Sequence, residues 1–294
     1  MERFLNNFPI QQIDSKSPGF PKALKNLPAM PEVLYFRGNY KILNEKCFAI
    51  VGTRRPTDYG KSVALSFANQ LAKSGLVIVS GLALGIDSLA HQSCINENGL
   101  TIAVLGSGLD EQSFYPKENL KLAKQILEKN GCLISEYPTG TKGALYTFPQ
   151  RNRIIAGLSI GVLVVEAKIK SGALITANYA KQYKKFVFAI PNSIYTQTSH
   201  GCNFLIKNGA RLVESSNDIL EILGMNKTAE TQNLFASPQE KIIADILQNG
   251  PLHIDAIIEK TKMPSQTISG IICIMELEDK IKNLGGNTYA INHR

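Results

Sequence analysis

Tryptophan is absent from this chain of 294 residues, and cysteine and histidine are scarce. A disulfide framework or a zinc site needs clustered cysteine and histidine positions. Here the four histidines are scattered and no Cys-x-x-Cys pair occurs; the five cysteines are Cys47, Cys94, Cys132, Cys202 and Cys273. The sequence therefore predicts reduced, mostly buried thiols and no metal site.

Long hydrophobic runs are also missing, since no apolar stretch approaches the ~20 residues that a membrane span requires. Glu2, Asn6 and Asn7 interrupt the first ten residues, which excludes the apolar centre of a secretory signal. With 44% hydrophobic and 19% charged residues, the chain can bury cores for about two domains. We expect a cytoplasmic protein without a membrane partner.

Acidic residues are in deficit, and the net charge is +8. The first 235 residues carry 26 lysines and arginines against 17 acidic residues, whereas the segment from Ala236 to Arg294 carries six against seven. A basic surface favours a polyanionic partner. Electrostatic contact with nucleic acid is therefore expected in the larger, N-terminal part.

Residues 1–45 contain five prolines and are predicted to form an irregular lead-in with one helical turn near 21–27. From Cys47 on, apolar runs of strand length alternate with segments of helix length. The predicted strands are 47–51, 76–80, 101–105, 132–135, 160–165, 186–190 and 211–213. The predicted helices are 58–74, 86–97, 117–129, 152–158, 172–184, 200–208 and 216–223.

These strands show no polar alternation, which is typical of strands buried on both faces. Their alternation with helices indicates βαβ units and a mostly parallel sheet. The sequence thus predicts an α/β, Rossmann-like domain over 46–223.

The C-terminal part is predicted to be a separate small domain. Residues 224–237 are polar and aperiodic and are interpreted as a linker. The segment 238–294 contains three helical patterns, at 238–248, 253–260 and 264–279, followed by a hairpin around Gly285-Gly286. Three small helices and a hairpin describe a winged helix. The third helix carries no arginine, so we expect this domain to add little direct affinity for DNA.

Four strand-to-helix loops carry glycine or cationic groups. The first follows the strand at 47–51, the second follows 76–80, and a third, with Lys168 and Lys170, follows 160–165. Glycine lets the backbone approach a phosphate, and a helix N-terminus attracts anions. The candidate phosphate-contacting residues of the first two loops are Gly52, Thr53, Arg54, Arg55, Ser80, Gly81 and Gly85.

The fourth loop leads into Phe148-Pro-Gln-Arg151-Asn-Arg153. An exposed aromatic ring beside two arginines suits single-stranded nucleic acid, because stacking contributes roughly 1–3 kcal/mol per base. An equally weighted alternative is that Phe148 is a core residue and that the arginines pair with Glu136 or Glu166. No loop is decisive alone; their convergence at one sheet edge carries the prediction of a nucleic-acid site.

Enzyme classes find little support in the motifs. The Ser80–Asp87 loop is not G-x-G-x-x-G, no acidic residue ends the second strand, and no G-x-x-x-x-G-K-[ST] occurs. A nicotinamide cofactor and a P-loop ATPase are therefore disfavoured, and we expect no cofactor and no catalytic residue. Asp87, Asp110, Glu136 and Glu166 are expected to cap helices or pair with arginines.

With these residues in view, the chain resembles the DNA-processing protein A family, also called DprA or Smf, from about Phe20 to Ile222. The ordered motifs include Leu34-Tyr-Phe-Arg-Gly38, the Gly-Thr-Arg turn, Ser80–Asp87, Tyr115-Pro116, Phe148–Ser159, Ser171–Ala177 and Gly201–Ile206.

The resemblance implies an extended Rossmann fold that protects single-stranded DNA, forms a homodimer and loads RecA recombinase during natural transformation. It also implies that Arg54 and Lys170 hold phosphates and that Phe148 stacks a base. Lys142 is assigned to DNA contact as well. The resemblance places the dimer contact at Asn203, Leu205 and Ile206.

Some features depart from the family pattern. The family's N-terminal helical domain is largely missing, Asn192 stands where glycine is usual, and Lys142 and Leu145 stand where prolines are common. The rival resemblance is to Rossmann-like nucleotide phosphoribohydrolases, but no catalytic glutamate follows Lys170–Thr176. A pure protein-interaction adaptor is a third class, and it would show no DNA affinity at low salt.

Overall fold

The computed structural model describes residues 5, 7–25, 27–225, 237–248 and 250–292. The chain divides into two compact units, Met1–Lys227 and Thr228–Arg294. Most of the predicted linker, 224–237, lies outside the described residues. Each unit is therefore considered by itself.

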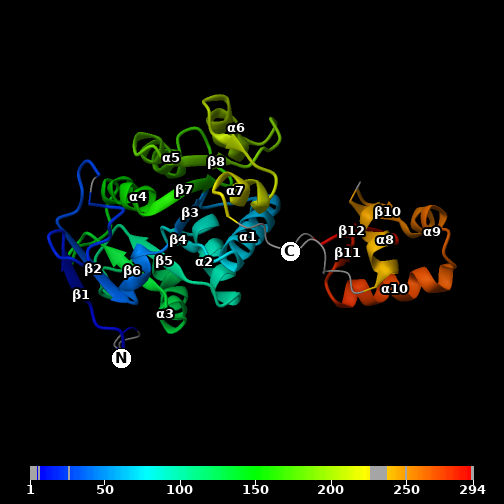
Figure 1. The fold of residues 1–294 in the computed structure, drawn as a ribbon, viewed down its shortest axis with the longest axis horizontal. Helices are drawn as coiled ribbons and strands as arrows, with labels where there is room; N and C mark the ends of the chain where they lie inside the picture. Colours follow the sequence, from blue (N-terminus) through cyan, green and yellow to red (C-terminus); the bar gives the residue numbers. More distant parts are fainter. Residues whose placement is uncertain (1–4, 6, 26, 226–236, 249, 293–294) are drawn as a thin grey trace. The chain divides into compact units, whose positions relative to one another are not determined.

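The first unit is built on a nine-stranded sheet (Figure 1). In spatial order its strands are β1 (Gln11–Asp14), β2 (Val33–Gly38), β6 (Cys132–Ser135), β5 (Thr101–Leu105), β4 (Val77–Ser80), β3 (Cys47–Val51), β7 (Ser159–Val164), β8 (Phe186–Ala189) and β9 (Arg211–Leu212). In this spatial order, all strands from β6 through β5, β4, β3, β7 and β8 to β9 are parallel to one another. β2 pairs antiparallel with β6, and β1 pairs antiparallel with β2, at one edge of the sheet. Every predicted strand is found, with ends that differ by no more than one residue.

The N-terminal segment corrects a prediction, because residues 11–14 and 33–38 are strands of the sheet rather than an irregular lead-in. Leu34 and Phe36 are buried, as are Phe20 and Leu24 from the connecting segment. Pro31 precedes β2, and no proline interrupts the strand. β2 pairs along the otherwise open edge of β6 and buries two side chains in the core, which explains why so proline-rich a segment becomes ordered.

Helices cover both faces of the sheet (Figure 1). One face carries α1 (Asp58–Lys73), α2 (Ile86–Asn96), α3 (Leu120–Glu128) and α7 (Ser216–Ile222). The other carries α4 (Thr147–Leu158), α5 (Gly172–Gln182) and α6 (His200–Lys207). Short 3-10 turns lie at η1 (Tyr40–Asn44), η2 (Lys117–Asn119) and η3 (Gln197–Ser199).

The strands are buried on both faces, as their composition predicts. Along β5, Ile102 and Val104 enter the core under α4 and α5, whereas Ala103 and Leu105 enter the core under α3. A hydrophobic core therefore forms on each face of one mostly parallel sheet. The predicted α/β, Rossmann-like class is confirmed. The helix predicted at 152–158 begins earlier, at Thr147, so Phe148 lies in its first turn.

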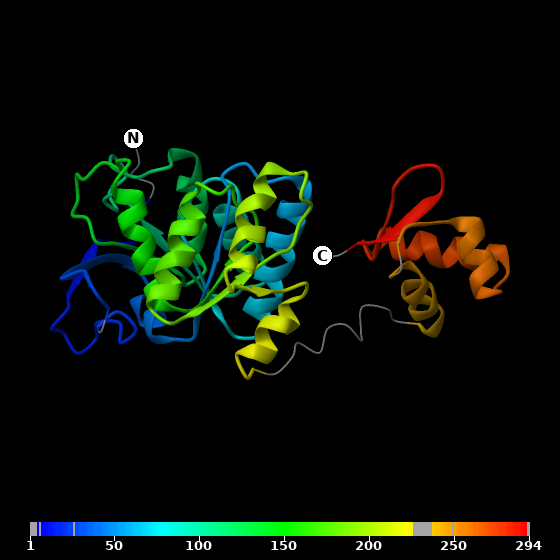
Figure 2. The same cartoon turned by 90° about the horizontal axis from the view of Figure 1, so that it is seen from above.

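The second unit contains α8 (Pro238–Leu247), α9 (Ile254–Thr261) and α10 (Ser265–Leu277), with β10 (Leu252–His253), β11 (Ile281–Asn283) and β12 (Thr288–Ile291) in a three-stranded sheet. Figure 2 shows the hairpin in red beside the orange helices. Ile268, Ile272 and Met275 of α10 are buried, but Leu277 is 80% exposed because it ends the helix. Among the described residues, no helix is long and apolar enough to cross a membrane.

Candidate single-stranded DNA interface

The predicted loops meet at the carboxyl edge of the sheet. The chain leaves β3 for β4 on one side, while β7 lies on the other, so β3 and β7 flank the point where the strand order reverses. Ligands of open α/β sheets bind beyond the carboxyl ends of the strands at such a point. Thr53, in the loop after β3, joins the loops after β4 and β7. Its N–H donates to the Glu166 carbonyl at 2.7 Å, and its carbonyl accepts from Ile86 N–H at 3.2 Å.

Glycine makes this close approach possible at two positions. A Cβ on Gly52 would lie 2.6 Å from Cγ1 of Ile86. Gly85 has a φ of +84°, and a Cβ there would overlap the backbone of Thr53 and Arg54. These two glycines therefore pack the loops together and hold the Arg54 backbone in place.

Phe148 is half-exposed and lines a pocket at this edge. Its ring lies 5.3 Å from the Tyr115 ring, and the Arg54 Cζ lies 5.7 Å from its centroid. A Cβ on Gly106 would lie 2.8 Å from the ring, and one on Gly143 would lie 2.7 Å from it. The pocket is lined by Arg54, Gly81, Ala83, Leu84, Gly106, Tyr115, Pro116, Phe148 and Arg151. Phe148 is thus an accessible ring between two glycines and not a core residue.

Tyr115 is 44% exposed and was not predicted as a site residue from sequence reasoning. It follows β5 in a loop without cations, so no local charge pattern points to it. In the sequence, Tyr115-Pro116 stands out only as a motif of the family resemblance, and the ring geometry with Phe148 places Tyr115 in the pocket.

Arg151 and Arg153 are not the exposed phosphate contacts that the sequence predicts. Arg151 is 5% exposed, and its Nη1 donates to the carbonyls of Gly81, at 2.6 Å, and Val104. Burial lowers the pKa of Arg151 to about 10. Arg153 pairs with Glu136, and both side chains are largely buried. The first turns of α4 lie over the ends of β4 and β5, whose carbonyls need donors, so Arg151 forms the floor of the pocket.

Ser80 is likewise buried, and its hydroxyl donates to the Ile50 carbonyl at 2.6 Å. The Gly81 N–H donates to the Asp87 carboxylate at 3.0 Å. A DNA contact predicted for Ser80 and Gly81 therefore cannot use the Ser80 hydroxyl or the Gly81 N–H, because intramolecular hydrogen bonds already occupy both donors. Both residues shape the loop instead.

The remaining predicted cations are accessible. Arg54 and Arg55 lie on the β3 loop, Lys170 on the β7 loop and Lys142 on the loop before α4, and all four are exposed. Thr53 is half-exposed between them. Arg54 lines the Phe148 pocket and Lys142 adjoins Gly143 at the ring, whereas Arg55 and Lys170 are exposed on loops of the same sheet edge. These cations are accessible to the phosphates of a strand whose base enters the pocket.

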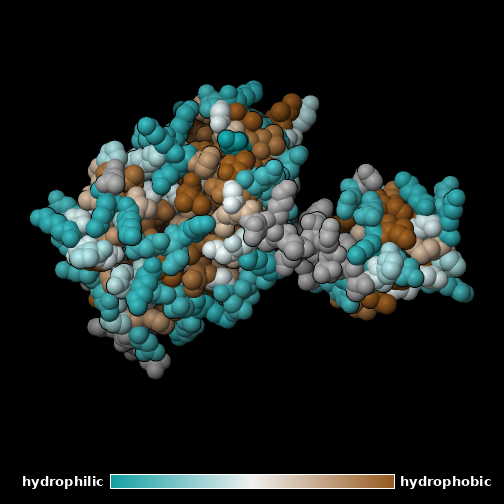
Figure 3. All heavy atoms as spheres, viewed as in Figure 1, coloured by the Kyte–Doolittle hydropathy of each residue, from teal (hydrophilic) through white to brown (hydrophobic). Residues whose placement is uncertain are grey.

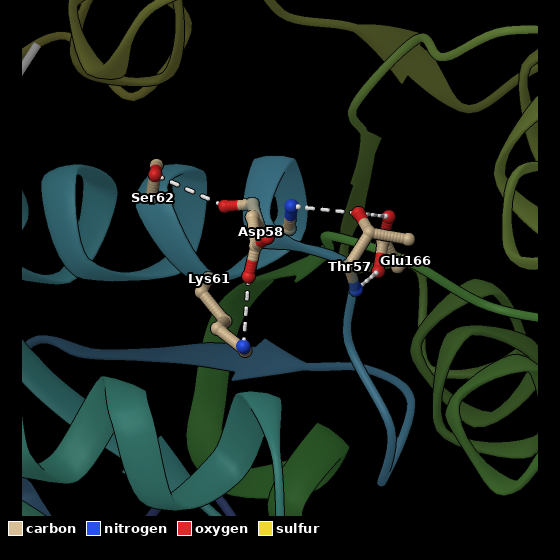
Figure 4. Close-up of polar contacts among 6 residues, drawn as sticks. Thr57, Asp58, Lys61, Ser62 and Glu166 are labelled. Atoms are coloured by element: carbon tan, nitrogen blue, oxygen red, sulfur yellow. Dashed lines mark hydrogen bonds and ion pairs between the residues drawn. The ribbon is translucent and has the colours of Figure 1, made fainter.

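The N-terminus of α1 holds a carboxylate of the chain itself (Figure 4). Glu166 is fully buried; its Oε2 accepts the Thr57 N–H at 2.9 Å and its Oε1 accepts the Thr57 hydroxyl at 2.6 Å. Nδ2 of Asn192 adds a bond of 3.3 Å to Oε1. The helix end where many doubly wound proteins bind a phosphate is therefore already neutralised. Glu166 caps a helix and Glu136 pairs with an arginine, as their sequence context predicts.

The predicted dimer segment lies on α6, and the structure corrects one of its residues. Leu205 is 7% exposed and packs in the core, while Nδ2 of Asn203 donates to the Asn192 carbonyl at 3.1 Å. Ile206 is half-buried, and Phe204, at 47%, is the apolar side chain of α6 that faces solvent. Figure 3 shows hydrophobic side chains gathered around α6.

The scattered thiols behave as predicted where the structure describes them. Cys47, Cys94, Cys132 and Cys202 are buried and Cys273 is exposed, all as free thiols. Within the described parts of the chain, no three histidine, cysteine or acidic side chains lie close enough together to hold a metal ion.

The fold and this edge define a Rossmann-like protein with an aromatic pocket beside Arg54, further exposed cations at the same edge and a winged-helix unit. The family described as DNA recombination-mediator protein A matches residues 11–224, and the DprA winged helix domain matches 227–287. The chain belongs to the DNA recombination-mediator protein A family. The predicted DprA/Smf family and the predicted winged helix are thereby confirmed.

The chain is 43% identical to DNA processing protein DprA of Bacillus subtilis over 223 residues, which is 76% of this chain and 72% of that one. It is 48% identical to Protein Smf of Synechocystis over 218 residues, 73% of this chain but only 54% of that relative. The chain thus spans about half the length of that relative. A structure of DNA processing protein A from Helicobacter pylori, described for its unique single-stranded DNA binding mode, has a TM-score of 0.67 and 33% identity and covers 75% of this chain and 97% of its own.

Proposed function

We propose that this protein binds single-stranded DNA at the carboxyl edge of its sheet, without strong sequence preference and without catalysis. The observation that carries the proposal is the half-exposed Phe148 ring in a pocket beside Arg54, with three further exposed cations on loops of the same sheet edge. A nucleobase can stack on the ring while Arg54, Arg55, Lys142 and Lys170 contact phosphates. The Helicobacter pylori relative, described by its single-stranded DNA binding mode, supports the same assignment.

The strand would be protected by this contact and handed to RecA recombinase in the cytoplasm, during natural transformation. Membership in a family of recombination mediators supports this role. A homodimer formed through α6 is part of the proposal, with exposed Phe204 and half-buried Ile206 as its apolar contacts in place of buried Leu205. The molar mass in solution, measured by light scattering, tests the dimer.

The alternative, a nucleotide phosphoribohydrolase, is less well supported by the geometry. The α1 N-terminus is taken by Glu166, and no Asp or Glu occurs in the sequence between Thr176 and Glu214. Release of ribose phosphate from a nucleotide would favour the alternative.

The test is a titration of labelled oligo-dT across a salt series. We expect the logarithm of affinity to fall with the logarithm of salt concentration, with a slope of roughly −0.7 per phosphate contact. Arg54→Ala should flatten that slope by about one contact. Phe148→Ala should weaken binding by roughly 1–3 kcal/mol and leave the slope nearly unchanged.

The chain offers a matched control pair at the opposite edge of the sheet. Arg211 Cζ lies 5.6 Å from the centroid of Phe186, which begins β8, so this pair repeats the geometry of Arg54 and Phe148. Arg211→Ala and Phe186→Ala should each change binding much less than their counterparts. Absence of wild-type binding at low salt, or equal losses in both pairs, would contradict the proposed site.

A further inference from the structure

Two loops lie against the Phe148 ring, and the first of them also lines the pocket. One, 106–116, follows β5 and carries Gly106 and Tyr115; the other, 136–146, follows β6 and carries Lys142 and Gly143. Because β5 and β6 are parallel neighbours, both loops leave the sheet at the same edge.

Two hydrogen bonds join these loops. The Gly108 N–H donates to the Thr141 carbonyl at 2.8 Å, and the Gly140 N–H donates to Oδ1 of Asp110 at 2.9 Å. The second carboxylate oxygen of Asp110, Oδ2, accepts from Ser113 N–H at 3.1 Å. One carboxylate therefore holds the tip of the second loop and the turn of the first.

The first loop is itself anchored from behind. Arg37 on β2 is 8% exposed, and its Nε donates to the Leu109 carbonyl, one residue before Asp110, at 3.0 Å. These hydrogen bonds thus connect strand β2, through Leu109 and Asp110, to the tip of the second loop.

The hydrogen bonds of Asp110 position side chains at the pocket. Exposed Lys142 lies two residues after Gly140, and Gly143 packs on the edge of the Phe148 ring. A Cβ on Gly143 would also lie 3.6 Å from the Tyr115 Cβ. A shift of the loop tip therefore moves a phosphate-contacting cation and opens one wall of the pocket.

Electrostatics alone gives no reason for an acidic group here, because a carboxylate repels DNA phosphates. Burial opposes ionisation of Asp110, but the hydrogen bonds from Gly140 and Ser113 outweigh it and lower the pKa of the carboxyl. Asp110 is therefore charged at neutral pH. Any favourable contribution of Asp110 to DNA binding must come from its hydrogen bonds, because its charge repels phosphates.

We propose that Asp110 is a positioning residue for DNA binding, which holds the 136–146 loop so that Lys142 meets a phosphate and Phe148 meets a base. This inference rests on the proposed single-stranded DNA binding. It also predicts opposite behaviour for two substitutions at one position.

The experiment compares Asp110→Ala with Asp110→Asn in the oligo-dT salt series. Asparagine keeps an oxygen for Gly140 N–H but removes the charge, so its affinity should stay within about twofold of wild type or rise, since repulsion is lost. Alanine should weaken binding about tenfold. It should also flatten the salt slope by ~0.7, the value for one phosphate contact, and Lys142→Ala should flatten it equally. The double variant Asp110→Ala/Lys142→Ala should bind no more than about twofold more weakly than Asp110→Ala, because the two changes remove one contact.

Asp218→Ala is the matched control, because Oδ2 of Asp218 also accepts backbone N–H groups, from Glu214 at 2.8 Å and Ser215 at 2.9 Å, but the residue lies on α7, which follows β9 at the opposite end of the strand order. Hydrogen exchange adds a measurement without DNA: amides 139–146 should exchange faster in Asp110→Ala and not in Asp110→Asn.

The outcomes separate the two proposals. If wild type binds and Asp110→Ala binds equally well or more tightly, the positioning role is overturned while the proposed function stands. Additive losses in the double variant, or unchanged exchange of the loop, also overturn it. If wild type does not bind, the proposed function fails and the role of Asp110 in DNA binding fails with it, whatever the exchange shows.

Discussion

His91 on α2 and Thr101 at the start of β5 form a fully buried polar pair. Nδ1 of His91 lies 2.7 Å from the Thr101 hydroxyl, which itself donates to the Ile78 carbonyl at 2.7 Å. The His91 ring must therefore donate from Nδ1, which assigns the neutral tautomer with Nε2 unprotonated. Burial, together with the charge of Arg151, lowers the pKa of His91 to about 3.

His91 should make the folded state sensitive to acid. An unfolded histidine binds a proton below about pH 6.5, but the folded one does so only near pH 3. Between these values the unfolded state holds the extra proton, so the free energy of unfolding falls as pH falls, by up to ~1.4 kcal/mol per pH unit. His91→Asn keeps a donor and cannot titrate. Urea unfolding at pH 7 and pH 5 should show a smaller loss for this variant, and parallel losses would contradict the assignment.

At the scale of elements, the interface depends on how strand ends and helix starts interlock. The β4 loop can lie against the β3 loop only because Gly85 adopts a φ of +84° at the start of α2. Backbone conformations of this kind cost a side chain of order 1–3 kcal/mol. The same residue supports the Arg54 backbone, so fold and site share this position.

Gly85→Ala should lower the free energy of unfolding by more than the backbone cost alone, because its Cβ would also overlap Thr53 and Arg54. Gly75→Ala is the control: Gly75 has a φ of +85°, but a Cβ there would meet nothing within 4 Å. Urea unfolding should show a loss of about 1–3 kcal/mol for the control and a larger loss for Gly85→Ala. Weaker oligo-dT binding is expected only for Gly85→Ala. Equal losses of stability would show that the loop contact is unimportant.

At the scale of the whole molecule, charge separates the two units. The first 235 residues hold 26 basic against 17 acidic residues, whereas the remainder holds six against seven. On α10 of the winged-helix unit, Ser265, Gln266, Thr267, Ser269 and Glu276 are exposed, and none is cationic. Duplex binding by such a helix would lack the phosphate contacts that dominate affinity.

A chain ending at Lys227 should therefore bind oligo-dT with nearly the affinity and salt slope of the full chain. The first unit has its own cores and sheet, which makes independent folding expected. The salt-series titration of both chains is the measurement. A slope that is clearly shallower in the shortened chain would assign phosphate contacts to the second unit.

The sequence alone predicted most elements of the fold, because buried parallel strands leave unbroken apolar runs at regular spacing. It missed β1 and β2, since short strands between prolines carry little periodic signal and are ordered by the core that they cover. It also predicted that four loops meet at one edge, which follows from parallel strand direction.

What only the tertiary structure decided is which side chains at that edge are free. Arg54 and Arg151 look alike in sequence, yet one is exposed and the other donates to buried carbonyls. Tyr115, Glu166 and Asp110 acquire their roles from partners at least 30 residues away in the chain. Local sequence determines which elements form, whereas access to solvent and to partners depends on contacts between segments that are distant in the chain.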